Sequence, residues 1–307
     1  MPRFLWCIIP ILACCLCCYN LQAQNALNVD VQKNVIYGEA VPLGKKKPKT
    51  LRCDIYRPAD DTLRPLLITL FGGSFVAGSR DYTDIELFCK RFAQHGYVVA
   101  TIDYRLMALH RLTPANLLRA GYLGAQDLCT ALRFLKGHSA DYGIDTTRVF
   151  LLGNSAGSVI LLHALFLDDH ERPIETREPT DLGPMPTDVA RGVTGAVAQW
   201  GCVFSPQIID STSQTPICLI HGTSDRIVPY NVGHSLTIRS FPRVYGSKAI
   251  ADRLDSLRMS NYELHTFVGE RHCFYFDILT ILHLNKLKFN TCFDIAYDFF
   301  NRCSPKP

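Results

Sequence analysis

The residues that decide the fold read RVFLLGNSAG at positions 148–157 and lead into an apolar segment that extends to Leu167. An apolar run followed at once by a helix-compatible segment predicts a strand, a sharp turn and a helix. Glycines at 153 and 157 remove the Cβ atoms that would collide at such a turn, so Ser155 can take a strained backbone conformation that exposes its hydroxyl. Ser155 also precedes a helix N-terminus, whose free N–H groups favour negative charge. These features indicate a catalytic nucleophile.

The composition is that of an ordinary globular protein. The chain has 307 residues, of which 48% are hydrophobic and 20% charged, so one α/β domain accounts for its length. The formal net charge is +4, and the lysines within 45–49 form a short cluster without interleaved aromatic residues. We therefore expect no nucleic-acid partner.

The N-terminus resembles an export signal. Arg3 precedes an apolar stretch from Phe4 to Cys18, and small or neutral residues up to Ala23 offer a cleavage position. The apolar stretch is too short for a stable membrane span. We expect a signal peptide over residues 1–23, a single mature domain over 24–307, and a periplasmic or secreted protein. One alternative is a lipoprotein anchored through Cys14, because residues 11–14 resemble a lipobox; the other is a buried apolar N-terminal helix.

The cysteines leave their pairing open. Of 13 cysteines, five lie in the N-terminal stretch, and the eight that follow it are Cys53, Cys89, Cys129, Cys202, Cys218, Cys273, Cys292 and Cys303. An even number in an exported chain permits disulfides, but several of these residues lie in apolar runs where free buried cysteine is common. No Cys-x-x-Cys pair and no histidine cluster at ligand spacing is present, so we expect neither a metal nor a cofactor.

Short β-rich runs alternate with longer helical stretches after residue 50. This order predicts a mostly parallel central sheet covered by helices on both faces. The predicted strands are 51–56, 66–71, 98–102, 149–152, 193–199, 217–220 and 262–268, and the predicted helices are 84–95, 114–136, 156–167, 232–240, 248–259 and 276–300. The proline-rich, charged segment at about 168–188 is expected to be a polar surface excursion, with a rim or cap over the site as the alternative.

A glycine-rich loop follows the second of these strands. Residues 70–75 read LFGGSF, so the backbone can approach a substrate oxygen closely. We expect the N–H groups of Gly73 and Ser74, together with that of Ala156 after the nucleophile, to form an oxyanion hole. An ordinary tight turn is the alternative for the glycine pair.

Serine needs a general base, and ten histidines are available. We favour His272, because it lies in an irregular segment directly after a strand and can reach across the sheet edge. His221 is more consistent with a side chain that stabilises a turn. His163 and His265 lie within a predicted helix and a predicted strand, where packing or outward-facing roles are ordinary.

The base in turn needs a carboxylate on its second ring nitrogen. Asp225 follows the strand at 217–220 within the loop His221 to Pro229. A plain turn residue is the alternative reading, but the order Ser155, Asp225, His272 is that of α/β hydrolases.

With these residues assigned, the chain from about residue 51 onward resembles α/β-hydrolase-fold serine esterases, a group that includes bacterial carboxylesterases, acetyl esterases and feruloyl-esterase-like proteins. The resemblance rests on the 72–73 glycine loop, on 103–106 (DYRL), on 142–145 (YGID) and on 153–157, as well as the 221–229 loop and His272. It implies Ser155 as nucleophile, His272 as base and Asp225 as the residue that orients it. The loop at 71–74 reads FGGS where lipase-like relatives have His-Gly-Gly-Gly, so the hydrogen bonds that support it must differ.

The resemblance implies an exported serine hydrolase that cleaves carboxylic esters, with short acyl groups favoured and a small-molecule or carbohydrate-linked ester as substrate. Two alternatives stay open: a peptidase of the same fold and a catalytically inactive binding protein. Acyl and alcohol specificity and oligomeric state cannot be read from the chain.

Overall fold

The computed structural model describes residues 26–178, 181–186, 190, 192–212, 214–276 and 284–304. The expected signal peptide at 1–23 and the alternative lipid anchor at Cys14 lie outside these residues. Among the helices that the structure describes, none is long and apolar enough to cross a membrane.

One large sheet forms the centre of the described residues. Its eight strands lie in the order β1-β2-β4-β3-β5-β6-β8-β11. Strand β2 pairs antiparallel with both β1 and β4, and the remaining neighbours in this sheet are parallel. The bounds are β1 (Val29–Ala40), β2 (Lys49–Pro58), β3 (Arg64–Leu70), β4 (Val98–Ile102), β5 (Ile144–Asn154), β6 (Gly195–Gln199), β8 (Ile217–Gly222) and β11 (Tyr262–Phe267).

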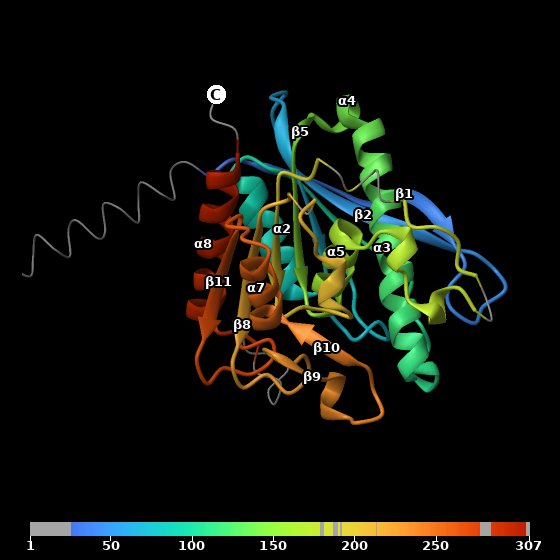
Figure 1. The fold of residues 1–307 in the computed structure, drawn as a ribbon. Helices are drawn as coiled ribbons and strands as arrows, with labels where there is room; N and C mark the ends of the chain where they lie inside the picture. Colours follow the sequence, from blue (N-terminus) through green and yellow to red (C-terminus); the bar gives the residue numbers. More distant parts are fainter. Residues whose placement is uncertain are drawn as a thin grey trace, which may run out of the picture.

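Helices cover both faces of this sheet (Figure 1). They are α2 (Thr83–Gln94), α3 (Pro114–Gly137), α4 (Ser139–Tyr142), α5 (Ala156–Phe166), α7 (Ser247–Ser256) and α8 (Lys286–Cys303). Helices α2 and α8 pack together through aromatic rings such as Phe92 and Phe293, whose centroids lie 4.7 Å apart. Helices α3 and α5 pack together on the opposite face. A parallel sheet buried on both faces explains why the central strands are continuous apolar runs.

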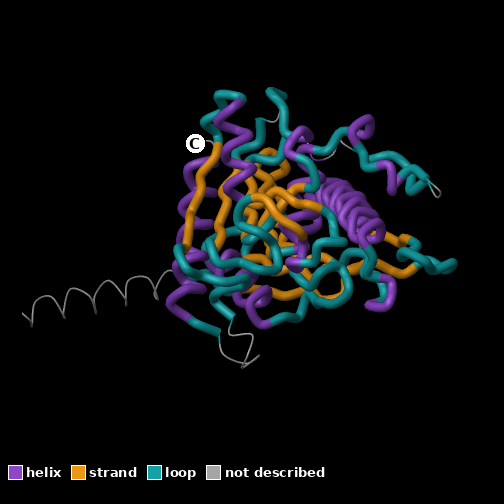
Figure 2. Tube along the Cα trace, turned by 60° about the horizontal axis from the view of Figure 1, so that its bottom comes forward, coloured by secondary structure: helices purple, strands orange, loops and turns teal. Residues whose placement is uncertain are grey.

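The carboxyl ends of the parallel strands meet at one edge. Figure 2 turns this edge forward and shows loops and turns gathered in front of the strand ends. A small second sheet lies among these loops and is formed by β7 (Cys202–Val203), β10 (Arg243–Gly246) and β9 (Val232–His234). Short 3-10 helices lie at 109–111, 169–171, 174–176, 206–208 and 235–237.

The seven predicted strands are all present, 98–102 with its predicted bounds and the other six with shifted ends, and four of the six predicted helices lie close to their expected bounds. The predicted helix at 232–240 is wrong: β9 occupies its start, and Leu236 and Thr237 have positive φ values of 58° and 56°, which a helix does not allow. The predicted helix at 276–300 starts too early, because α8 begins after Asn285, whose side chain accepts the N–H of Lys288 at 3.1 Å. Residues 277–283 of that prediction lie outside the described residues.

The polar excursion packs on α3 where the structure describes it. Arg119 donates to the carbonyl of Glu175 at 2.6 Å, and Tyr122 donates from its hydroxyl to the carbonyl of Gly183 at 2.8 Å. The described residues of this segment therefore lie along a helix flank, and none of them lines the pocket beside Ser155.

Candidate active site

Ser155 lies in the turn between β5 and α5. Its φ of 52° and ψ of −114° place a non-glycine residue in a strained region of backbone space. A Cβ on Gly157 would lie 2.3 Å from the carbonyl oxygen of Leu70, and one on Gly153 would lie 2.6 Å from the carbonyl carbon of Gly157. Only glycine fits at both positions, so the sequence RVFLLGNSAG forces the turn that presents the serine.

Three side chains that are distant in sequence form one hydrogen-bonded chain at the carboxyl edge of the sheet. His272 Nε2 lies 2.9 Å from Ser155 Oγ, and His272 Nδ1 lies 2.6 Å from Asp225 Oδ2. Because the ionised carboxylate can only accept, Nδ1 carries the proton and Nε2 is free to accept one from the serine. The structure thus brings together the three residues selected from the sequence, each from a loop or turn at a strand end.

Asp225 is held as an ionised carboxylate. Its Oδ1 accepts the backbone N–H groups of Ile227 and Val228 at 2.8 and 2.9 Å, and its Oδ2 accepts from both His221 and His272. Burial acts to raise the pKa of Asp225, but the hydrogen bonds from the two histidines, with their charges, outweigh it and hold the pKa well below its usual range.

His221 stabilises the loop that carries Asp225, as its position beside this turn indicated. Its buried ring donates from Nε2 to Asp225 Oδ2 and to the carbonyl of Val228, at 3.1 and 3.0 Å. Its Nδ1 lies 2.8 Å from the hydroxyl of Ser247 and accepts from it. The ring therefore fixes the orientation of the carboxylate and is not placed to exchange a proton with Ser155.

Two of the three expected oxyanion donors line the pocket at Ser155. Ser74 and Ala156 are among its lining residues, and Ala156 is the first residue of α5. Gly73 is not among the lining residues. With a φ of 128°, it shapes the loop, and a Cβ there would lie 2.1 Å from the carbonyl oxygen of Ala77. The next residues, Ser74 and Phe75, also have positive φ values, 52° and 62°, so this loop is held in an uncommon conformation beside the nucleophile.

Comparison with solved structures identifies this architecture. The apo form of Thermogutta terrifontis esterase 2 superimposes with a TM-score of 0.61 at 20% sequence identity, covering 92% of this chain and 97% of that one. The chain has the α/β-hydrolase fold. The predicted fold class is thereby confirmed.

Sequence comparison adds esterases to the similar proteins. A model of the BD-FAE family matches residues 53–182. Gut esterase 1 of Caenorhabditis elegans is 32% identical over 35% of this chain and 19% of its own length, and Carboxylesterase 3B of Mus musculus is 27% identical over 63% of this chain and 37% of its own length. The matches thus span from about a fifth to little more than a third of the length of these curated relatives. These matches confirm the resemblance to α/β-hydrolase esterases.

A small apolar pocket opens beside Ser155 in this α/β-hydrolase-fold protein. It has a volume of about 40 Å³, and its walls come from α5, the loop that carries Ser74 and the loops near β7 and β9. The lining residues are Ser74, Phe75, Leu117, Ser155, Ala156, Val159, Cys202, Phe204, Ile227, Val228, Ser235 and Leu236.

A buried polar network lies next to the Ser155 turn, and the sequence analysis did not predict it. The Asn154 amide donates to the hydroxyl of Tyr275 at 2.9 Å and to Asp84 Oδ2 at 3.2 Å, and the Tyr275 hydroxyl donates to Gln199 Oε1 at 3.1 Å. Tyr275 lies three residues after His272. The network therefore links the loop that carries the base to the residue that precedes the nucleophile. No local motif marks it, because its members come from four separate segments.

His163 and His265 have the ordinary roles expected of them. His163 is buried, donates to the carbonyl of Val159 at 2.7 Å and accepts the N–H of Phe204 at 3.2 Å; burial lowers its pKa to about 4. His265 bonds Glu263 on the same strand at 3.0 Å. Neither contacts Ser155.

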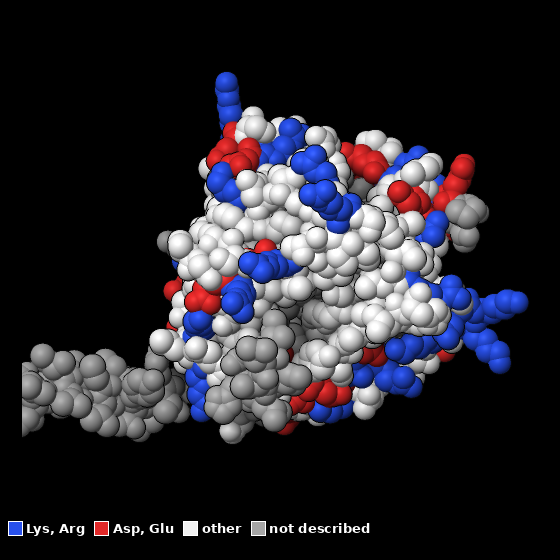
Figure 3. All heavy atoms as spheres, turned by 90° about the horizontal axis from the view of Figure 1, so that it is seen from below, with Lys and Arg blue, Asp and Glu red and all other residues white. Residues whose placement is uncertain are grey.

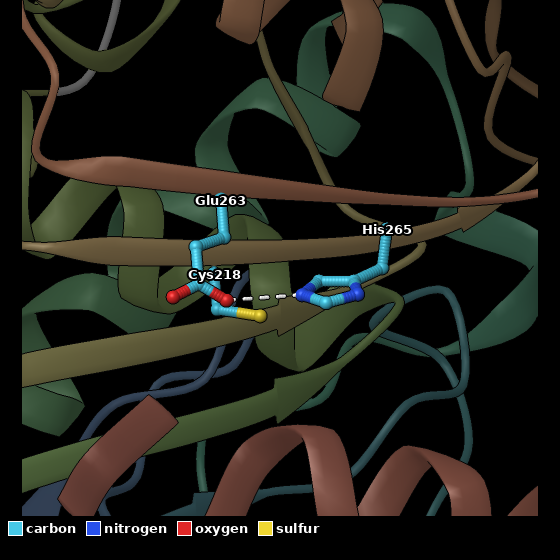
Figure 4. Close-up of side chains that lie close together, drawn as sticks. All are labelled: Cys218, Glu263 and His265. Atoms are coloured by element: carbon cyan, nitrogen blue, oxygen red, sulfur yellow. Dashed lines mark hydrogen bonds and ion pairs between the residues drawn. The ribbon is translucent and has the colours of Figure 1, made fainter. Parts of the chain in front are cut away.

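Strand register brings one potential metal-ligand set together away from the triad. Cys218 on β8 lies opposite Glu263 on β11, and with His265 their ligand atoms lie within 4.8 Å of one another (Figure 4). Arg302 on α8 already pairs with both oxygens of Glu263 at 2.7 and 2.9 Å. The only sign of a metal site here is therefore that the three side chains lie close together. The sequence does not show this, because the residues come from two different strands.

Of the eight cysteines from Cys53 to Cys303, six are buried, and none forms a disulfide with another described residue. The sequence left open whether these cysteines form disulfides, and the structure places most of them as thiols in apolar surroundings. Burial raises the pKa of Cys89 to about 12, so that thiol stays protonated and unreactive.

Proposed function

We propose that this protein is a serine esterase that cleaves carboxylic esters through Ser155, His272 and Asp225. The observation that carries the proposal is the continuous hydrogen-bonded chain from the Ser155 hydroxyl through His272 to Asp225. The esterase names of several relatives support the same reaction class. An inactive binding protein would not need this arrangement.

The proposed reaction proceeds in two balanced steps. Ser155 Oγ attacks the ester carbonyl carbon while His272 Nε2 takes its proton, and the N–H groups of Ser74 and Ala156 face the oxyanion. His272 then returns the proton to the alcohol oxygen as the carbon–oxygen bond breaks, which leaves an acyl-serine. A water molecule then attacks the acyl carbon while His272 takes a proton from it. His272 returns that proton to Ser155 Oγ as the bond between the acyl carbon and Oγ breaks, which releases the acid and restores the serine.

We also propose that the acyl group is short. The Ser155 pocket is small, at about 40 Å³, and its walls are largely apolar, which favours an acetyl group over a long acyl chain. As a further proposal, the N-terminal apolar stretch supports export of the protein. The proposed substrate is a carbohydrate-linked or small-molecule ester.

The test uses p-nitrophenyl esters of increasing acyl length. We expect the native protein to hydrolyse the acetate faster than the octanoate, and S155A to lose at least about a thousandfold in kcat while remaining folded. Circular dichroism and thermal melting check the fold, and a fluorophosphonate probe should label the native protein alone. Turnover by S155A equal to that of the native protein would exclude the assignment of Ser155.

A further inference from the structure

A second, larger pocket has the candidate base, His272, in its wall. It has a volume of about 430 Å³ and is lined by Ser224, Arg226, Ile227, Gly269, Arg271 and His272. Its two arginines come from different loops: Arg226 directly follows Asp225 after β8, and Arg271 directly precedes His272 after β11. The two loops that carry Asp225 and His272 therefore also carry one arginine each, next to these residues in the sequence.

Neither arginine is neutralised by an acidic partner within the part of the chain that the structure describes. Both are exposed. The neighbouring carboxylates are already engaged: Glu270 pairs with Lys288 at 2.6 Å, and Asp225 is buried against His221 and His272. The face seen from below in Figure 3 has basic side chains near its middle, with an acidic group beside one of them and much uncharged surface around them. Two positive charges thus face solvent at the pocket mouth.

The chemistry of ester cleavage decides which part of a substrate meets these charges. His272 Nε2 must deliver its proton to the alcohol oxygen as the ester bond breaks, so the alcohol lies on the side of His272. The acyl group lies on the side of Ser74 and Ala156, where the small apolar pocket opens. The 430 Å³ pocket, which includes His272, therefore receives the alcohol portion.

We propose that Arg226 and Arg271 form a subsite for the alcohol portion of the substrate, and that this portion carries a carboxylate. The inference rests on the proposed esterase function and specifies its substrate as a short acyl ester of an acidic alcohol or phenol. Guanidinium groups suit this role because their planar N–H donors match a carboxylate in bidentate geometry. Exposed charges at a pocket mouth also steer an anionic substrate toward the nucleophile.

The test compares 4-acetoxybenzoate with its neutral methyl ester, so that both substrates share the acetyl group and the phenolic leaving group. The readout is the ratio of kcat/KM for the anionic substrate to that for the neutral one, measured at low ionic strength. In R226Q/R271Q we expect this ratio to fall on the order of fivefold, the size typical of a few exposed charge contacts. The neutral ester reports any general loss of activity, and the ratio removes it.

R258Q is the matched control. Arg258 is also exposed, but it precedes β11 and lies toward the opposite end of that strand from the site. We expect its ratio to equal that of the native protein. An unchanged ratio in R226Q/R271Q, or an equal fall in R258Q, overturns the subsite. Failure of the esterase function gives a different result: S155A would then hydrolyse the neutral ester as fast as the native protein does.

Discussion

Gly157 shows how a single residue determines whether the nucleophile turn can form. A methyl group at this position would meet the backbone carbonyl of Leu70 on β3 at 2.3 Å, and a strand in the middle of a sheet cannot move aside. We therefore expect G157A to lower the free energy of unfolding by about 2 kcal/mol or more. Urea denaturation followed by circular dichroism measures this change.

Gly137 provides the matched control, because a Cβ there meets nothing within 4 Å. It ends α3, so alanine should be neutral or stabilise the protein by up to about 1 kcal/mol. If G137A and G157A changed the free energy of unfolding equally, the close approach of β3 to the turn would not be the reason why position 157 requires glycine.

The sequence reveals single residues to the extent that their signal is local. Ser155 is marked by its glycines and by the change from strand to helix pattern around it. Asp225 and His272 could be selected because parallel strands end at one edge, which brings their loops together. Tyr275, Arg226 and Arg271 carry no such mark, since their positions depend on how loops from different strands pack against one another.

At the scale of elements, the loop after β11 is tied to the nucleophile turn through Tyr275. Its hydroxyl contacts Asn154 and Gln199, and its ring packs on Trp200 with centroids 5.0 Å apart. We expect Y275F to lower the free energy of unfolding by about 1–3 kcal/mol, because Gln199 Oε1 loses its buried donor. We also expect kcat for p-nitrophenyl acetate to fall with little change in KM, since His272 would be less well positioned.

Y97F is the matched control for that prediction. Tyr97 is a buried tyrosine whose ring packs in the same aromatic cluster. Among the described residues, no hydrogen bond connects its hydroxyl to the site. Its removal should leave kcat unchanged. If Y275F kept its kcat while losing stability, the network would be structural and would not position the base.

The elements that sequence reasoning placed well are those with strong periodicity. The buried parallel strands and the long helices α3 and α5 have patterns that tertiary contacts reinforce. The segment at 232–240 has no such pattern: its first residues pair with β10 across a tight approach of Gly233 to Pro229, and tertiary pairing overrides helix propensity. Strand β1 was not predicted, because it is an exposed edge strand with many polar residues and breaks in register.

At the scale of the whole molecule, the low pKa of Asp225 links folding to pH. In the unfolded chain an aspartate titrates near pH 3.9, whereas in the folded protein the hydrogen bonds from His221 and His272 keep it ionised to lower pH. Between these values the unfolded state binds more protons, so stability rises with pH. The contribution of this carboxylate is therefore complete above the unfolded value and is lost as the pH falls toward the folded one.

D225N removes this titration and makes the effect measurable. We expect the native protein to have a higher free energy of unfolding than D225N, with the largest difference near pH 6. This difference should be about 1 kcal/mol smaller at pH 3. Urea denaturation of both proteins across this range gives the difference directly, and other buried acids such as Asp84 and Asp127 contribute equally to both proteins. A difference that stayed constant with pH would mean that the two histidines do not hold the carboxylate in its charged form, and the orientation of His272 would then need another cause.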